Sequence, residues 1–237
     1  MDGVPVLFIE EVCRQFSTKD ASALEELPFW KDVSRRLFTG RRMVNCGFYC
    51  RSDMPDVCVK LWKNDGYLRL EELESLPNAG IEHMCVSLND SRISGDILTP
   101  SYAAQLLKLS SKQRFSIAFK FVSYNPPRTI ANFPILTNFL MSLPRIYSID
   151  CDDWSLVEAV AGRAADRGTL RELSMLSLVE DPIAYKNILQ TFSRCRTLKL
   201  FRYYNLIRPN LELSDEEKAH FRMEKKPKEH VIDFIHI

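Results

Sequence analysis

The chain has 237 residues, 46% of them hydrophobic, and its 32 lysines and arginines nearly balance its 31 aspartates and glutamates. This balance gives no basis for non-specific binding to nucleic acid or to an acidic membrane, because both need an excess of positive charge. No run of about 18 apolar residues is present, so the sequence predicts no membrane-spanning helix.

The cysteines and the N-terminus predict an intracellular protein. The seven cysteines are odd in number and scattered, which is typical of reduced thiols in the cytoplasm or the nucleus. Asp2, Glu10 and Glu11 lie where a secretory signal peptide has a basic start and an apolar run. We therefore expect a cytoplasmic or nuclear location and no disulfides.

Residues 4–38 predict three short helices. Pro5 suits the first turn of the first helix, where its missing N–H has no intrahelical partner to lose. A second helix is expected over 21–27 and ends at Pro28. A third helix carries Trp30, Val33 and Leu37 at helical spacing on its apolar face, and it ends at Gly40. Three such helices have little core of their own, so we expect them to pack on the next segment or on a partner.

This N-terminal segment resembles the F-box. The resemblance lies in a proline that opens the first helix, an aspartate that begins the second, a tryptophan that anchors the third and nearby apolar residues: Val4, Pro5, Ile9, Val12, Asp20, Trp30 and Val33. The chain departs from the motif at Val4 and Ala21, where the family has leucine, and in a shorter interval from Asp20 to Trp30. With the α/β repeats that follow, the arrangement looks like the large F-box families of nematodes.

The resemblance implies a non-enzymatic adaptor. The N-terminal helices would dock on a Skp-type adaptor of a cullin ubiquitin ligase, and the repeat domain would hold a target protein. The residues expected to contact the Skp-type adaptor are Pro5, Phe8, Ile9, Val12, Leu24 and Trp30. In the alternative interpretation, these helices only cap the repeats, and the chain is a stand-alone protein–protein interaction module without a ligase role.

Residues 41–80 predict an edge strand near 43–49, a strand over 57–62 and a short helix over 70–76. The strand over 57–62 alternates apolar and polar residues. Pro77 and Gly80 end the helix.

A leucine-rich-repeat-like pattern organises the middle of the chain. Residues 170–178 read L-x-x-L-x-M-x-x-L, and similar frames begin at Ile81, Leu143 and Cys195, with a weaker one around Phe115. Their second apolar positions are Met84, Phe115, Ile146, Leu173 and Leu198, at steps of 31, 31, 27 and 25 residues. Steps of this size predict one strand and one helix per unit, with helices expected over 102–109, 135–143, 156–167 and 183–192.

The sequence thus predicts an α/β fold: an N-terminal helical unit followed by a strand–helix solenoid with a mostly parallel sheet. The alternative is an ordinary α/β domain with irregularly spaced strands. We expect an F-box-like unit over 1–40, a repeat domain over 41–201 and a C-terminal cap over 202–237. In the cap, a capping box at Ser214–Glu217 predicts a helix to about Lys225, and 231–237 predicts a final strand or a packed tail.

Sequence motifs for catalysis or cofactors are not found. The eight glycines form no phosphate-binding loop. Cys46, Cys50, Cys58 and His83 are the only candidate metal ligands, and buried thiols explain these cysteines better because no second close pair follows. We therefore expect no enzyme activity, no cofactor and no metal.

Polar residues of the expected strands are the candidate target-binding set: Asp150, Asp152, Glu172, Ser174, Lys199 and Arg202. The aromatic residues Phe201, Tyr203 and Tyr204 around Arg202 have two interpretations. They form a binding hot spot, in which tyrosine and arginine are enriched, or alternate residues of a last strand face the core.

Overall fold

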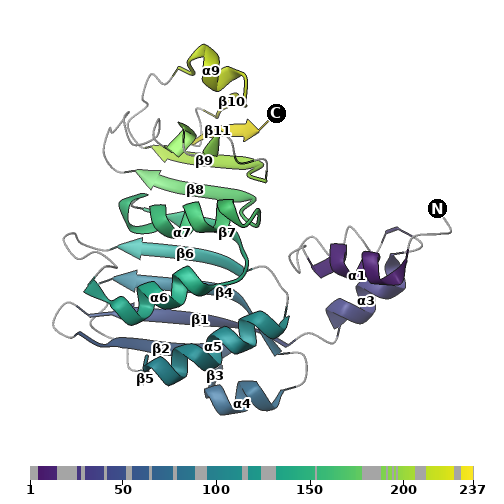
Figure 1. Ribbon diagram of the computed structural model, residues 1–237, viewed down its shortest axis with the longest axis vertical. Helices are drawn as coiled ribbons and strands as arrows, with labels where there is room; N and C mark the ends of the chain where they lie inside the picture. Colours follow the sequence, from purple (N-terminus) through teal and green to yellow (C-terminus); the bar gives the residue numbers. More distant parts are fainter. Residues whose placement is uncertain are drawn as a thin grey trace.

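The computed structural model describes residues 5–14, 26–27, 30–39, 42–51, 55–63, 66–76, 79–88, 95–113, 117–123, 132–152, 154–177, 188–190, 192–193, 195, 197–205, 212–226 and 231–236. These residues form a pair of N-terminal helices and a large sheet with helices on one face (Figure 1).

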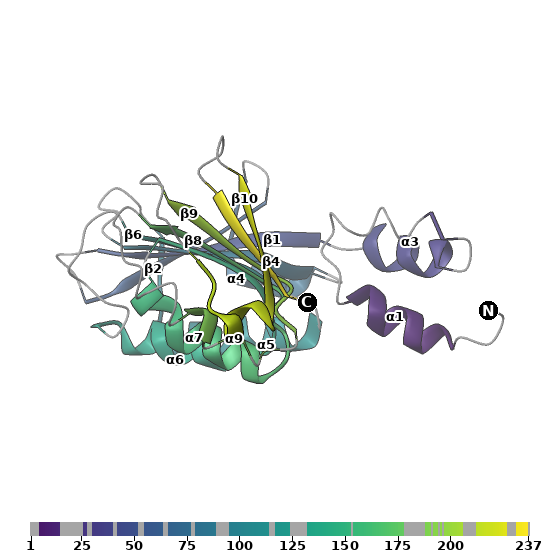
Figure 2. The same cartoon turned by 90° about the horizontal axis from the view of Figure 1, so that it is seen from above.

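The N-terminal unit consists of α1 (Val6–Arg14) and α3 (Lys31–Thr39), which pack against each other. The carbonyl of Pro5 accepts hydrogen bonds from the N–H groups of Phe8 and Ile9, at 2.9 and 3.2 Å, so Pro5 opens α1 as expected. The expected helix over 21–27 lies almost wholly outside the described residues. Figures 1 and 2 both place the pair beyond the ends of the strands, and its small core is separate from that of the sheet.

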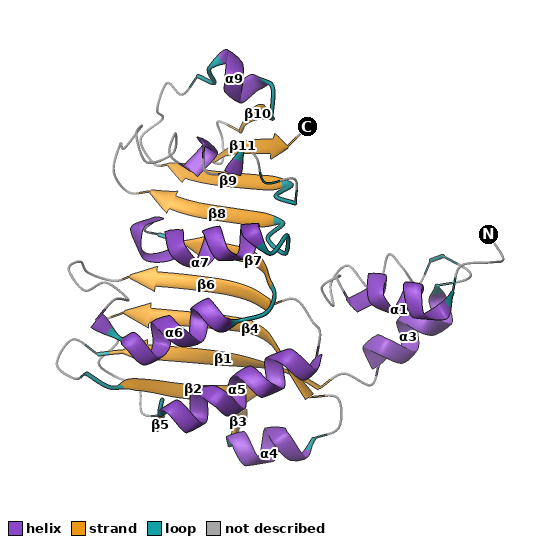
Figure 3. Cartoon of the chain, in the orientation of Figure 1, coloured by secondary structure: helices purple, strands orange, loops and turns teal. Residues whose placement is uncertain are grey.

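Among the described residues, eleven strands form one mixed sheet, which is drawn in orange in Figure 3. They are β1 (Arg42–Cys50), β2 (Val57–Lys63), β3 (Gly66–Leu68), β4 (Ala79–Leu88), β5 (Asp96–Ile97), β6 (Ile117–Ser123), β7 (Ile146–Cys151), β8 (Glu172–Ser177), β9 (Leu200–Asn205), β10 (Phe221–Lys226) and β11 (Val231–His236). The spatial order is β10-β11-β9-β8-β7-β6-β4-β1-β2-β3, and β5 also pairs with β2.

Six neighbouring strands, from β1 through β4 and β6 to β9, run parallel. Strands that pair antiparallel with their neighbours flank these six: β2, β3 and β5 at one side, and β11 and β10 at the other. The expectation of an α/β fold with a mostly parallel sheet is confirmed. The expectation that residues 43–49 form an edge strand is wrong, because β1 lies between β4 and β2.

Helices connect the strands: α4 (Leu70–Ser75), α5 (Pro100–Gln113), α6 (Pro134–Ser142), α7 (Trp154–Asp166) and the single turn α9 (Asp215–Lys218). The first four agree with the expected positions to within a few residues, whereas the expected helix over 183–192 lies mostly outside the described residues. Figure 2 shows α5, α6 and α7 together on one face of the sheet.

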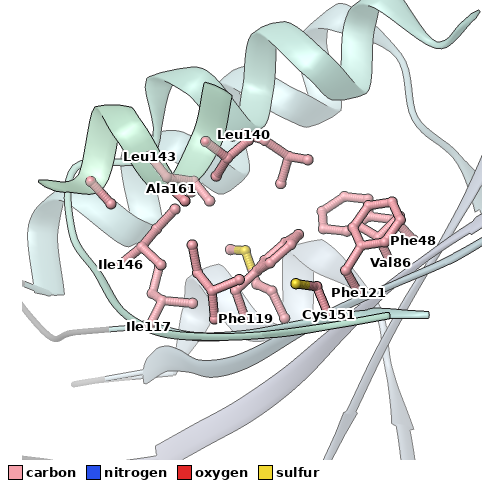
Figure 4. Packing of buried hydrophobic residues seen from close by; sticks show 14 of the residues in the cluster. Phe48, Val86, Ile117, Phe119, Phe121, Leu140, Leu143, Ile146, Cys151 and Ala161 are labelled. Atoms are coloured by element: carbon pink, nitrogen blue, oxygen red, sulfur yellow. The ribbon is translucent and has the colours of Figure 1, made fainter. Parts of the chain in front are cut away.

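The core lies between these helices and the sheet, as Figure 4 shows for Phe48, Phe121 and Leu140. Alternate strand residues are apolar and point toward the helices, which is the period expected of a sheet with one covered face. Phe48 of β1 meets Phe139 of α6 with ring centroids 5.2 Å apart.

The expected register is wrong by three residues on two strands. Leu173 of β8 pairs with Ile149 of β7 and with Phe201 of β9, rather than with Ile146 and Leu198. Ile146, Leu173 and Leu198 are nevertheless all buried, as expected. Apolar residues recur every three positions at Ile146 and Ile149 and at Leu198 and Phe201, so the expected frame fits at either place, and only the hydrogen-bonded pairing decides between them.

At β4 the expected alignment of Met84 with Leu173 is found. Met84 shares a row with Phe119, Ile149 and Leu173 through successive pairings. The β6 member of that row is thus Phe119, whereas the expected Phe115 lies outside the described residues.

The C-terminal prediction needs one correction. The capping box forms, since the Ser214 N–H donates to the Glu217 carboxylate at 2.7 Å and Ser214 Oγ accepts from the Glu217 N–H at 3.2 Å. The helix ends at Lys218 rather than near Lys225, and Phe221–Lys226 forms β10 against β11. Pairing with the final strand, which is confirmed over Val231–His236, outweighs the helical start.

Candidate functional site

The N-terminal helix α1 exposes a cluster of large apolar side chains. Leu7 is 76% exposed, Phe8 55% and Val6 53%, and Leu27 beside the pair is 46% exposed. We call these four residues the N-terminal apolar patch. On the other side of the unit, Ile9, Cys13 and Val33 are buried together and Trp30 packs against them. The helix pair therefore has an inner apolar core and, outside it, large apolar side chains that are exposed on three consecutive residues of α1.

The structure divides the six residues expected to contact the Skp-type adaptor. Pro5 and Phe8 are exposed, Val12 and Trp30 are half-buried, and Ile9 is buried inside the unit. Leu24 lies outside the described residues. Sequence reasoning missed Val6 and Leu7, although an apolar run of four residues from Val6 to Ile9 is longer than one helix face requires.

A second candidate surface is the face of the sheet opposite α5, α6 and α7, which we call the open face. Pairing aligns one residue from each of five neighbouring strands in a row across this face: Lys120, Asp150, Ser174, Arg202 and Asp233. Residues paired in this way are about 4.8 Å apart from strand to strand.

The charges along this row are paired. Arg202 Nε donates to Asp233 Oδ1 at 2.7 Å, and Arg202 Nη2 donates to Oδ2 at 3.3 Å. The hydrogen bond to Asp233 raises the pKa of Arg202 further above its ordinary value. Lys120 Nζ lies 3.5 Å from Asp150, and both side chains are well exposed, so this ion pair contributes about 1 kcal/mol or less.

Four of the six expected target-binding residues come together on the open face. Asp150, Ser174 and Arg202 share the row, and Glu172 lies in the next row, where its carboxylate accepts from the Tyr147 hydroxyl at 3.3 Å. Asp152 directly follows β7, and Lys199 directly precedes β9 and is exposed.

The row contains two charged residues that sequence reasoning missed. Lys120 and Asp233 are single charged residues inside apolar strands, at 117–123 and 231–236. That isolation is a signal that could have marked both as lying on the face opposite the apolar side chains. Lys120 is exposed there, whereas Asp233 is buried.

The aromatic residues around Arg202 serve mainly the core. Phe201 and Tyr203 are buried, and the Phe201 ring stacks on Phe234 with centroids 5.4 Å apart. The interpretation that alternate residues of the last strand face the core is therefore correct for Phe201 and Tyr203. Tyr204, on the other face, is half-buried.

The four candidate metal ligands do not converge. Cys46 and Cys50 are buried on the helix-covered face of β1, whereas His83 is exposed on β4. Among the described residues no group of three or more histidine, cysteine, aspartate and glutamate side chains could hold a metal ion. Burial raises the pKa of Cys50 to about 12 and that of Cys46 further, so both are neutral thiols near neutral pH.

Two hollows lie at opposite edges of the sheet. One, of about 370 Å³, lies where β3 and β5 both pair with β2, and its polar lining includes Lys60, Tyr67 and Asp96. Lys60 Nζ is 4.8 Å from the centre of the Tyr67 ring. The other hollow, of about 450 Å³, lies beside β10 and is lined mainly by Leu213, Phe221 and Met223.

Comparison with protein-family models, with curated proteins and with solved structures finds no match to this chain. In the part of the chain that the structure describes, no helix has the length and apolar character needed to cross a membrane.

Proposed function

We propose that the chain is a non-enzymatic adaptor of a cullin-type ubiquitin ligase, acting in the cytoplasm or the nucleus. The N-terminal helix pair docks on a Skp-type adaptor, and the repeat domain binds a target protein through the open face. In this proposal the six parallel strands and their helices are units of a leucine-rich-repeat-like solenoid, and the antiparallel strands at the two ends close it.

The N-terminal apolar patch is the observation that carries the proposal. Leu7 and Phe8 remain exposed while Ile9 and Cys13 fill the core between α1 and α3. A helix that presents neighbouring apolar side chains to solvent is suited to a hydrophobic groove of another protein. The resemblance to the F-box supplies the identity of that partner.

The test is a pull-down with purified Skp-type adaptor, comparing the wild-type chain with a Pro5→Ala/Phe8→Ala double variant. Because both side chains are exposed, we expect the variant to lose binding and to keep the melting temperature of the wild type. Leu176→Ala is the matched control, since Leu176 is an exposed apolar residue on β8. It should bind like the wild type.

Failure of the wild-type chain to bind at micromolar concentration, about 8 kcal/mol of association free energy, would reject the ligase role. The chain would then be better described as a stand-alone interaction module. In that case the double variant would have no binding to lose, and a lower melting temperature would show that Pro5 and Phe8 support the fold.

A further inference from the structure

Among the described strands, β10 is the last at its end of the sheet. In the described part of the chain, β10 pairs with β11 on one side and no strand lies on its other side. Figure 2 looks down on this edge and shows α9 on the helix-covered side rather than over the strand. An edge of this kind presents main-chain N–H and C=O groups with which another strand can pair.

The apolar hollow of about 450 Å³ lies next to this edge. The helix layer ends here in α9, a helix of only four residues. Leu213, Phe221 and Met223 line the space together with the charged residues Glu212, Lys218 and Arg222. Phe221 and Met223 are alternate residues of β10 on the side of the buried Phe234, with which Met223 pairs. A strand added along β10 would direct every second side chain toward this hollow.

The charges on β10 select the kind of strand that can pair there. Residues 221–226 include three cations, Arg222, Lys225 and Lys226, and one anion, Glu224. Arg222 Nη2 lies 2.9 Å from Glu224 Oε1, and the Arg222 side chain is 66% exposed. Cationic edges oppose pairing between two copies of the same strand, because they bring like charges together. The same charges favour an acidic strand.

We propose that β10 is a docking edge for an acidic, extended segment of a partner protein. The segment adds to the sheet as a twelfth strand through main-chain hydrogen bonds. Its acidic residues lie opposite Arg222, and alternate apolar residues enter the hollow formed by Leu213, Phe221 and Met223. This mode of recognition is β-strand addition, in which the main chain gives affinity and the hollow gives specificity.

The probe is a synthetic peptide as long as β10 that alternates valine with glutamate, and the control peptide alternates valine with lysine. Binding to the full chain is measured by fluorescence anisotropy, and amide hydrogen exchange is followed over all of residues 221–226. We expect the acidic peptide to bind and to slow exchange in β10, and the basic peptide to do neither. Arg222→Glu should weaken binding about fivefold, since it replaces attraction by repulsion across the strand pair. Lys108→Glu, the same charge reversal at an exposed residue of α5 away from β10, should leave binding unchanged.

Three results would overturn the proposal: no binding of the acidic peptide at millimolar concentration, equal binding of the two peptides, or an unchanged affinity in Arg222→Glu. A concentration-dependent dimer of the chain in analytical ultracentrifugation, lost in Arg222→Glu, would overturn it in favour of a second copy at this edge. None of these results depends on the N-terminal apolar patch, so the ligase proposal is tested separately.

Discussion

Arg202 and Asp233 join the last parallel strand to the final strand of the chain. The guanidinium of Arg202, on β9, donates two hydrogen bonds to the carboxylate of Asp233 on β11, at 2.7 and 3.3 Å. The Asp233 side chain is only 4% exposed, against 32% for Arg202. The arginine is thus one partner of a buried carboxylate, and the ion pair adds to the strand pairing and the Phe201–Phe234 contact that join β11 to β9.

We expect Arg202→Ala to lower the free energy of unfolding by about 2–3 kcal/mol, because it removes two charge-assisted hydrogen bonds from the buried Asp233 carboxylate. This loss is smaller than the loss expected on breaking a fully buried ion pair, because the Arg202 side chain is 32% exposed and water screens it. Urea unfolding measures it. In the double variant Arg202→Met/Asp233→Leu the buried charge is absent, so the loss should be smaller than in Arg202→Ala. An equal or larger loss in the double variant would show that packing, not charge pairing, is what Arg202 contributes.

Leu173→Ala should lower the free energy of unfolding by about 2–5 kcal/mol, as expected for a truncation in a packed core. Leu173 is fully buried and lies in the row that runs from Met84 to Phe201. Leu176→Ala on the same strand is the control, because Leu176 is exposed on the other face. It should change stability by less than about 0.5 kcal/mol. A change under 1 kcal/mol for Leu173→Ala would contradict its place in the core.

Thiol counting under denaturing, non-reducing conditions should return all seven cysteines. None of the seven is joined to another in the structure. In the native protein Cys85 and Cys195 should react first with a thiol reagent, because they are half-buried and the other five are buried. A denatured count of five or fewer would contradict the proposed cytoplasmic or nuclear location.

Stability should fall as the pH rises above 9. The pKa of the Cys50 thiol is raised by burial from 9.0 to about 12, so the unfolded chain loses this proton before the folded one does. The stabilising contribution of this thiol is complete below pH 9 and is lost between pH 9 and about 12. By pH 10 the loss in the free energy of unfolding is about 1.4 kcal/mol. Urea unfolding at pH 8 and pH 10 measures the change. Cys50→Ala should show a smaller loss between the two pH values, and an identical loss would assign the effect to other groups.

Much of the fold could be predicted from the sequence, because it depends on local patterns. The alternation of apolar residues around Leu173 and the helical spacing between the strands indicate parallel strands joined by helices. The burial of Ile146 and Leu198 follows from the same pattern. These features need only the period of the side chains and the residues that begin and end each element.

Only the tertiary structure decides the strand register and the secondary structure of segments that fit two local patterns equally well. Whether Leu173 pairs with Ile146 or Ile149 depends on hydrogen bonds between strands, since both residues are apolar and three positions apart. Phe221–Lys226 starts after a genuine helix cap, yet pairing with β11 makes it a strand.

The candidate surfaces divide in the same way. The sequence alone marks α1 as strongly apolar and Arg202 as a polar residue of a strand. It does not show that Ile9 points inward while Leu7 and Phe8 point to solvent, because α1 is apolar over most of its first two turns and only the position of α3 selects the buried side. Nor does it show that Arg202 meets Asp233, 31 residues away. Contacts between segments far apart in the chain are set by packing of the whole sheet, and no local period encodes them.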